Sequence, residues 1–191
     1  MNVVLGILNR IYRIYKNYYR KIAIQRLMRR GLVVGKNFRM GDGAIIDPSH
    51  CWHISIGDDV RLARRAIIFA HDGSTSKFVN HMRIGKVTIG NRVFIGACSI
   101  ILPGVSIGSN VIIGVGSVVT HDIPDGVVAA GNPAEVIGSI EDFVLRQKRG
   151  MEIYPLFGEE YRLENNVSMD MKTEMNNKMK DRYGYIILRF R

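Results

Sequence analysis

Histidine and cysteine, two residue types whose side chains can move a proton or bind a metal, are few in this sequence. They are His50, Cys51, His53, His71, His81, Cys98 and His121. A neutral imidazole can act as a general base near neutral pH, because its unperturbed pKa is about 6.5. The spacing of His50 and His53 could also suit a metal, but His-x-x-His in a loop is weak evidence for zinc. The residue types alone leave a base, a metal ligand and a solvated surface residue open.

The elements that must position these side chains are tandem hexads. From Ile89 to Pro124 the sequence reads IGNRVF, IGACSI, ILPGVS, IGSNVI, IGVGSV and VTHDIP. The first position is always β-branched and the second is usually Gly, and such a short fixed period indicates stacked repeats. Six residues of strand span roughly 20 Å, so three such sides close a triangular prism lined by the first-position aliphatics. We expect Gly at the second position to let the backbone turn each corner.

The same period extends toward the N-terminus with two interruptions. The earlier first positions are Val34, Met40, Ile46, Ile56, Leu62 and Ile68. Grouping in threes predicts four coils and a partial fifth, namely Val34–Ile46, Ile56–Ile68, Ile89–Ile101 and Ile107–Val119. The insertions, residues 47–55 and 71–88, end the first two coils. We therefore expect both to leave the prism at one edge, with His71 at the start of the longer one.

Composition predicts one domain with terminal additions. The chain has 191 residues, of which 47% are hydrophobic, enough for a substantial core. Its only cysteines, Cys51 and Cys98, offer no disulfide framework and favour a reducing, cytoplasmic location. Cys98 lies inside a hexad, where we expect it to be a small buried hydrophobic residue.

The N-terminal segment, residues 1–31, carries much of the net charge of +10. The segment contains no Asp or Glu. Its basic residues are Arg10, Arg13, Lys16, Arg20, Lys21, Arg26, Arg29 and Arg30. Apolar residues at steps of three and four, Leu8, Ile11, Tyr15, Tyr18 and Ile22, predict an amphipathic helix. It can cap the repeat stack, or residues 1–30 can lie against an anionic membrane surface at the inner face. The apolar residues are too interrupted for a membrane span or a signal peptide.

The rest of the chain gives weaker patterns. We predict a repeat domain over residues 32–138 and a C-terminal helix and tail over residues 139–191, since Ser139 and Asp142 are typical of a helix start. Residues 159–182 are polar and rich in Met, Asn and Lys, and we expect them to be poorly ordered or weakly helical.

The hexads, the corner at His71, the run IGVGSVVT from Ile113 to Thr120 and the AGNPA of residues 130–134 resemble the hexapeptide-repeat acetyltransferases. The nearest branch is that of the galactoside and maltose O-acetyltransferases and the sugar acetyltransferases of surface-polysaccharide clusters. The resemblance covers residues 34–140. It implies an all-β solenoid, a left-handed parallel β-helix, which is an exception to the right-handed crossover rule. It also implies a homotrimer that holds acetyl-CoA between neighbouring prisms, a carbohydrate acceptor, and no metal.

The resemblance assigns roles to particular residues. His71 matches the catalytic histidine, which would take the proton of a sugar hydroxyl. The matches to coenzyme A contacts are Phe94, Ala97, Val115, Thr120, Asn132 and Pro133. Asp42 and Asp47 match polar positions that hold the acceptor or orient the histidine, and the ring of Trp52 could stack on a sugar. For each of these residues a purely structural role is also open.

One departure affects the cofactor contacts. Relatives usually carry Arg or Lys directly after the Asn-Pro-Ala, where this chain has Glu135, and a second basic residue where it has Gly138. An acidic side chain there would repel the nucleotide phosphates. Arg146, Lys148 or Arg149 could replace the missing charge. The departure leaves open a non-catalytic scaffold protein with a membrane-surface helix.

Three further functions compete with direct O-acetyl transfer. A zinc-dependent carbonic anhydrase of this fold would need a histidine pair separated by four residues, and no such pair occurs. Nucleic-acid binding finds support only in the high pI, because the basic residues form one helix without a recognition motif. N-acetylation of an amino sugar fits the sequence as well as O-acetylation does. Direct transfer is favoured over an acyl-enzyme because neither cysteine is well placed as a nucleophile.

Overall fold

The computed structural model describes residues 2–180 and 182–188, without the side chains of residues 2–7, 9, 10, 13, 14 and 17. Arg10 and Arg13 of the predicted basic helix face therefore lie outside the described side chains. The chain divides into two compact units, residues 1–140 and residues 141–191.

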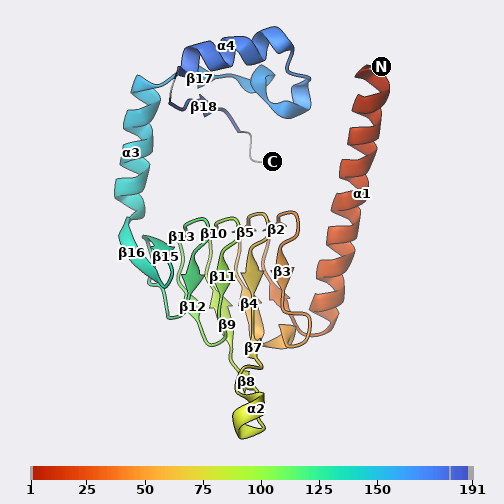
Figure 1. Cartoon of the computed structure of the whole chain (residues 1–191), viewed down its shortest axis with the longest axis vertical. Coiled ribbons are helices and arrows are strands. Elements are labelled where there is room, and N and C mark those ends of the chain that lie inside the picture. Colours follow the sequence, from red (N-terminus) through yellow and green to blue (C-terminus); the bar gives the residue numbers. More distant parts are fainter. Residues whose placement is uncertain (1, 181, 189–191) are drawn as a thin grey trace. The chain divides into compact units, whose positions relative to one another are not determined.

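The first unit contains the predicted coils of short strands (Figure 1). The strands of the first two coils are β1 (Val33–Val34), β2 (Arg39–Met40), β3 (Ile45–Ile46), β4 (Ile54–Ile56), β5 (Arg61–Leu62) and β6 (Ile67–Ile68). Those of the next two are β9 (Val87–Ile89), β10 (Phe94–Ile95), β11 (Ile100–Ile101), β12 (Ser106–Ile107), β13 (Ile112–Ile113) and β14 (Val118–Val119).

The coils stack in register through parallel pairing into three sheets. One sheet has the order β1-β4-β9-β12 and another β14-β11-β6-β3. The third, β16-β15-β13-β10-β5-β2, ends in an antiparallel pair formed by β15 (Val127–Gly131) and β16 (Ala134–Ser139). Ile123 bridges to Ile107, and with β15 it forms a partial fifth coil. The predicted grouping of hexads into coils is confirmed.

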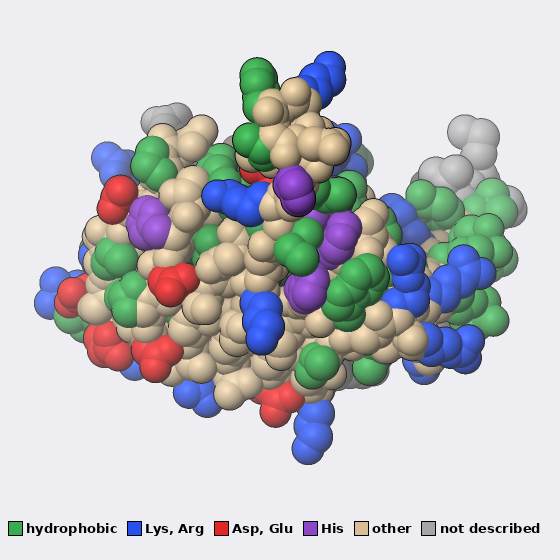
Figure 2. Space-filling view, turned by 90° about the horizontal axis from the view of Figure 1, so that it is seen from below, with side chains coloured by type: hydrophobic (Ala, Val, Ile, Leu, Met, Phe, Trp, Pro, Cys, Tyr) green, Lys and Arg blue, Asp and Glu red, His purple; other side chains and the backbone are tan. Residues whose placement is uncertain are grey.

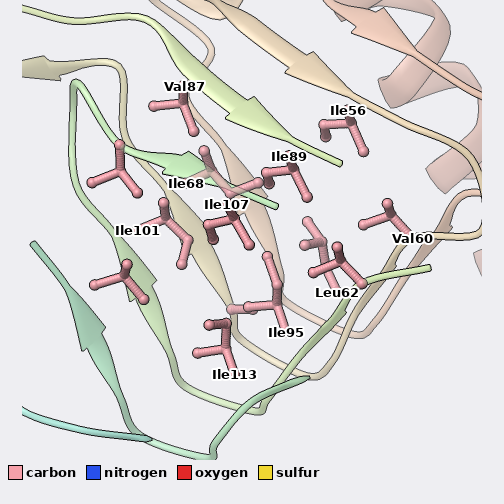
Figure 3. Packing of buried hydrophobic residues seen from close by; sticks show 14 of the residues in the cluster. Ile56, Val60, Leu62, Ile68, Val87, Ile89, Ile95, Ile101, Ile107 and Ile113 are labelled. Atoms are coloured by element: carbon pink, nitrogen blue, oxygen red, sulfur yellow. The ribbon is translucent and has the colours of Figure 1, made fainter. Parts of the chain in front are cut away.

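The core is the axis of the stack, and two hexad positions fill it. First-position residues such as Ile95, Ile101 and Ile113 have no exposed surface, and Figure 3 shows them meeting inside the coils. Fifth-position residues such as Val93 and Val111 are buried with them. Each fully buried aliphatic side chain of this size stabilises the fold by roughly 1.5–3 kcal/mol through burial.

The glycines at the second hexad position have a different role from the one that the sequence predicts. Positive φ occurs at the fourth position instead, for example at Cys98 (φ 59°) and Asn110 (φ 56°). A Cβ added at Gly96 would lie 2.6 Å from the backbone of Gly114 in the next coil. The second position therefore favours Gly because stacked coils approach closely there. Cys98 lies on this turn and is exposed, so the expectation that it is buried is wrong.

Two edges of the stack matter for the site. The His71 edge is defined as the corners that follow β3, β6, β11 and β14. The Val115 edge is defined as the corners that follow β2, β5, β10, β13 and β15. Both insertions leave from the His71 edge, as predicted. The first contains the 3-10 helix η1 (Cys51–His53), and the second is an arm of β7 (His71–Asp72), α2 (Ser76–Val79) and β8 (Arg83–Ile84).

Helix α1 (Asn2–Arg29) docks on the first coil through its C-terminal half. Leu27 packs against the core cluster, and Asp42 forms ion pairs with Lys16 and Arg20. The predicted apolar face does not pack there in its N-terminal part, because Leu8, Ile11, Tyr15 and Tyr18 are each more than half exposed. Among the described residues, no helix is both long and apolar enough to span a bilayer.

The second unit has more regular structure than the sequence predicts. Helix α3 (Ile140–Ile153) starts where expected and leads to β17 (Leu156–Phe157), which pairs in parallel with β18 (Tyr185–Ile186). Between them lie η2 (Glu159–Tyr161), η3 (Leu163–Asn165) and α4 (Met169–Met179), whose first turn is capped by the Ser168 hydroxyl. Phe157 is buried and packs on Tyr161, at 5.2 Å between ring centroids, which gives this segment a small core of its own.

Candidate active site

Stacking of the first two coils brings Asp47 and His71 together. Asp47 directly follows β3, and its backbone N–H donates to Ile68 of β6 at 2.9 Å. The chain then passes from Ile68 to Ala70, whose N–H donates to Oδ2 of Asp47 at 3.0 Å. The next residue is His71, whose Nδ1 contacts the same oxygen. The hexad register thus places a carboxylate beside the imidazole without help from a flexible loop.

Asp47 is fully buried and held by four hydrogen bonds. Its Oδ1 accepts from the backbone N–H groups of Ser49 and His50, at 2.9 and 3.2 Å, and its Oδ2 from Ala70 and His71. Burial by itself raises the pKa of Asp47, but hydrogen bonds from Ala70, His71, Ser49 and His50 outweigh it, and the pKa is lowered. Asp47 is therefore an ionised, acceptor-only carboxylate at neutral pH.

The ionised carboxylate fixes the tautomer of His71. Since Asp47 can only accept, Nδ1 of His71 must carry the proton that it shares with Oδ2. Nε2 of a neutral ring is then the basic nitrogen. The His71 side chain keeps 30% of its surface exposed. The arrangement can accept a proton from a group that approaches the His71 edge.

The first insertion lines the edge next to His71. The His50 ring lies 4.8 Å from the His71 ring and 5.2 Å from the Trp52 ring, centroid to centroid. His53 stacks beyond, parallel to His50 at 6.3 Å. Trp52 is 49% exposed. Figure 2 shows histidine side chains gathered on this face beside hydrophobic and basic ones.

The three predicted acceptor residues do not form one group. The His50 ring contacts both the Trp52 ring and the His71 ring, so Trp52 lies near His71. Asp47 contacts His71 directly but has no exposed surface that an acceptor could reach. Asp42 follows β2 and so belongs to the Val115 edge, where Lys16 and Arg20 of α1 bind it. Of the two roles that the sequence leaves open for Asp47, its burial fits orientation of the histidine.

The predicted coenzyme A residues lie along two edges. Ala97 and Val115 follow β10 and β13, and the N–H of Gly116 donates to Ala97 at 2.8 Å. Asn132 and Pro133 form the exposed turn between β15 and β16, at the end of the same Val115 edge. Thr120 follows β14 and therefore belongs to the His71 edge. One chain thus keeps Ala97 and Val115 on a different edge from His71.

Three residues predicted to affect the coenzyme A groove, Phe94, Val115 and Glu135, lie on the surface. Phe94 on β10 is 38% exposed and Val115 is 75% exposed, so both present apolar surface. Glu135, which departs from the expected basic residue, is exposed on β16 and pairs with Ala130. The basic residues that could replace it, Arg146, Lys148 and Arg149, belong to α3 in the second unit.

The position of His50 could be predicted from the sequence only in part. The sequence counts it, with Trp52 and His53, among the sugar-binding residue types of the first insertion, and with His53 as a weak metal pair, whereas the structure places its ring against His71. The grouping of coils contains the missing signal, because the first insertion and His71 both leave the same edge from neighbouring coils. The family resemblance alone gives no role to this position.

Comparison with known proteins identifies the repeats. The family model for the bacterial transferase hexapeptide, with six repeats, matches residues 86–121. The galactoside O-acetyltransferase of Escherichia coli is 40% identical over 116 residues, which cover 57% of this chain and 54% of that protein. Protein CapG of Staphylococcus aureus is 39% identical over 129 residues, covering 65% of this chain and 75% of CapG.

Among solved structures, one match is to a sugar acetyltransferase. The maltose O-acetyltransferase from Clostridium difficile is 38% identical, with a TM-score of 0.49 over 57% of this chain and 59% of that one. The match to the galactoside O-acetyltransferase likewise spans only about half of that relative's length. The repeats, their parallel stacking and the extent of the match to CapG place the chain in a family. It belongs to the bacterial hexapeptide-repeat transferases.

Proposed function

We propose that this protein transfers an acetyl group from acetyl-CoA directly to a carbohydrate hydroxyl, with His71 as the general base and Asp47 as a positioning residue. The observation that carries the proposal is the hydrogen bond between Nδ1 of His71 and the buried carboxylate of Asp47 at the edge of a hexad stack. Membership of the hexapeptide-repeat transferases supports acetyl-CoA as the donor.

The geometry supports a simple sequence of proton transfers. Nε2 of His71 takes the proton of the acceptor hydroxyl as its oxygen attacks the thioester carbonyl carbon. The resulting tetrahedral oxyanion collapses and the carbon–sulfur bond breaks. The imidazolium of His71 returns its proton to the sulfur, and coenzyme A leaves as the thiol. Asp47 stays ionised throughout and stabilises the transient imidazolium. The products are the acetyl ester and free coenzyme A.

The positions of the cysteines support direct transfer. Cys51 is completely buried, and its Sγ lies 3.6 Å from the carbonyl oxygen of Leu27 in α1. Cys98 is exposed but lies on the Val115 edge, on a corner that His71 does not share. Among the residues that the structure describes, no hydrogen bond joins either thiol to a basic side chain, as an acyl-enzyme mechanism needs.

We further propose that the acetyl-CoA groove forms between copies of the chain in a homotrimer. The His71 edge carries the base and Thr120, whereas Ala97, Val115 and Asn132 follow the Val115 edge. In such a trimer, the His71 edge of one copy would lie against the Val115 edge of its neighbour. The exposed apolar surface of Phe94 and Val115 would then be covered.

The acceptor is proposed to be a sugar of a polysaccharide or of a lipid-linked precursor, with Trp52 as the stacking surface. The exposed ring of Trp52 lies beside His50 and close to His71, and aromatic faces suit the C–H groups of a pyranose. An amino group on the sugar could take the place of the hydroxyl, because the same base serves both. A panel of sugars and amino sugars separates the two.

The test is acetyl transfer to that panel by the full chain, with products identified by mass spectrometry. We expect wild type to acetylate a hydroxyl acceptor and His71→Ala to lose the activity by a factor of about 10²–10⁴. His81→Ala, which removes an exposed imidazole on the arm, is the matched control. Full activity of His71→Ala would overturn the mechanism, and bound acetyl-CoA without transfer to any acceptor would favour the scaffold protein.

A second proposal concerns the N-terminal helix, which we infer contacts an anionic membrane surface. Tyr12, Tyr15, Tyr18 and Tyr19 are each more than half exposed, on a helix with basic residues and no acidic ones. Aromatic and basic side chains together suit the boundary of anionic lipids. Flotation with anionic vesicles tests this. Binding should weaken in high salt and in a Tyr15→Ser, Tyr18→Ser double variant, and unchanged flotation of that variant would contradict it.

A further inference from the structure

We propose that Asp47, His50 and His71 together bind a transition-metal ion such as Zn²⁺, and that the bound ion inhibits the protein by occupying His71. Each residue offers one ligand atom, and these atoms all lie within 4.8 Å of one another. The inhibition rests on the proposed function of His71, whereas the binding does not.

His50 is the residue that makes this cluster a metal site rather than a catalytic pair alone. Its Nδ1 is buried and has no hydrogen-bond partner among the residues that the structure describes. A buried polar atom without a partner destabilises the fold, because it has lost its hydrogen bonds to water. The backbone N–H of His50 donates to Oδ1 of Asp47 at 3.2 Å. This hydrogen bond holds the His50 backbone next to the carboxylate that would be the second metal ligand. A metal ion bound at Nδ1 would satisfy this nitrogen.

The donor set selects the class of metal. Two imidazole nitrogens and one carboxylate oxygen suit Zn²⁺, Co²⁺, Ni²⁺ and Fe²⁺, whereas Mg²⁺ and Ca²⁺ prefer oxygen ligands alone. Tetrahedral ligands at about 2.0–2.1 Å from zinc lie roughly 3.3 Å apart. The three atoms are therefore within a small side-chain adjustment of a coordinating arrangement. Solvent would supply the fourth ligand at the partly exposed edge.

Occupation of the site has a direct chemical consequence. The carboxylate of Asp47 and the ring of His71 already share one proton. If the metal binds Nδ1 of His71, the neutral ring must carry its single proton on Nε2 instead, and the ion takes the place of the proton between Nδ1 and the carboxylate. With the ion on Nδ1 and the proton on Nε2, the ring has no free nitrogen, so it cannot take the proton of an acceptor hydroxyl. The ion acts here as an inhibitor and takes no part in the transfer.

The single tryptophan of the chain is a built-in reporter of this binding. The Trp52 ring lies 5.2 Å from the His50 ring, and paramagnetic Co²⁺ bound to His50 should quench its fluorescence. We propose a titration of the full-length protein with Co²⁺, followed by fluorescence and by the visible absorption of the coordinated ion. Zn²⁺ should reverse the quenching by competition, and Mg²⁺ at the same concentration should leave it unchanged.

Matched variants separate the cluster from its neighbours. We expect His50→Gln and His71→Gln each to weaken Co²⁺ binding by about tenfold or more, a loss that even supporting groups around a metal can cause. His53→Gln removes an imidazole next to Trp52 but outside the cluster, and His121→Gln removes one on a different coil. Both should bind as wild type does. Equal binding by wild type and His50→Gln, or loss of binding in His53→Gln alone, would overturn the proposed site.

A second measurement tests the inhibition. Acetyl transfer, followed by chromatography of acetyl-CoA and coenzyme A, should fall as Zn²⁺ saturates the site and recover when a chelator is added. His50→Gln, compared with its own metal-free activity, should need at least about tenfold more Zn²⁺ for the same fractional loss. Full activity with the site saturated would refute inhibition. If no acceptor is acetylated even without metal, the proposed function fails, while the Co²⁺ titration still decides the site.

Discussion

Oδ2 of Asp47 accepts a hydrogen bond from Nδ1 of His71, although 24 positions separate the two residues in the sequence. The pair exists because each residue leaves its coil at the same edge, and because coil one stacks on coil two in register. Asp47 and His71 are the first residues of the two insertions, so the stacked coils hold both of them directly, while the residues around them come from further along the insertions.

Replacing the carboxylate by an amide should separate orientation from basicity. Asp47→Asn keeps the size of the side chain but can turn its amide N–H toward His71, which favours the wrong tautomer. We expect kcat to fall by a factor on the order of 10²–10⁴ with a much smaller change in KM. Steady-state kinetics checks this, and circular dichroism shows whether the variant is folded. A folded variant with normal kcat would show that Asp47 does not position His71.

The stability of the protein should depend on pH through the same carboxylate. The pKa of Asp47 lies below its usual 3.8, since the hydrogen bonds that it accepts outweigh the effect of burial. A carboxyl group whose pKa is lower in the folded state stabilises that state above the unfolded pKa, and this contribution disappears as pH falls through the folded value. Wild type should therefore lose more thermal stability than Asp47→Asn between about pH 5 and the acid limit.

Thermal unfolding of both proteins across that pH range measures the difference. Other carboxylates titrate in both proteins alike, so their contribution cancels in the comparison. Parallel melting temperatures of wild type and Asp47→Asn at every pH would contradict the lowered pKa.

The fold could be predicted from sequence in unusual detail because its period is short and its rules are local. Every sixth side chain must fit the same space at the axis. Equivalent positions such as Ile95 and Ile113 therefore lie opposite each other when β10 pairs with β13. The role of the second-position glycines could not be predicted in this way. A side chain is excluded at these positions by the backbone of the neighbouring coil, and the sequence of a single hexad contains no information on that contact.

The site was predicted only in part, for a related reason. The sequence singles out His71 because it matches the family's catalytic histidine at a break in the period, and its catalytic role stays a proposal. The contacts of the other side chains depend on which edge they leave. Asp42 and Asp47 look alike in sequence, yet one binds Lys16 on the Val115 edge and the other is buried behind His71. In the second unit the sequence indicates the start of α3, but the pairing of β17 with β18 and the small core around Phe157 have no periodic pattern from which they could be predicted.

A core residue and an exposed one of similar type should respond differently to truncation. Ile95→Ala removes a side chain with no exposed surface and leaves a cavity on the axis, whereas Val33 is 59% exposed. We expect Ile95→Ala to lower the free energy of unfolding by about 2–5 kcal/mol and Val33→Ala by less than about 1 kcal/mol. Denaturant titration measures both. Similar losses in the two variants would contradict a continuous core along the axis.

The close approach of stacked coils can be tested with two glycines. A Cβ at Gly96 would lie 2.6 Å from the carbonyl carbon and oxygen of Gly114, and backbone cannot move aside as a flexible side chain can. At Gly73, on the arm, nothing lies within 4 Å of an added Cβ. We expect Gly96→Ala to destabilise the protein by about 1–3 kcal/mol, the usual cost of overpacking, and Gly73→Ala to be nearly neutral. The measurement is again denaturant unfolding, read as the shift in midpoint. Since Gly96 does not have positive φ, a loss of stability at this position can be assigned to the contact between coils, and an unchanged midpoint would show that the coils are free to separate.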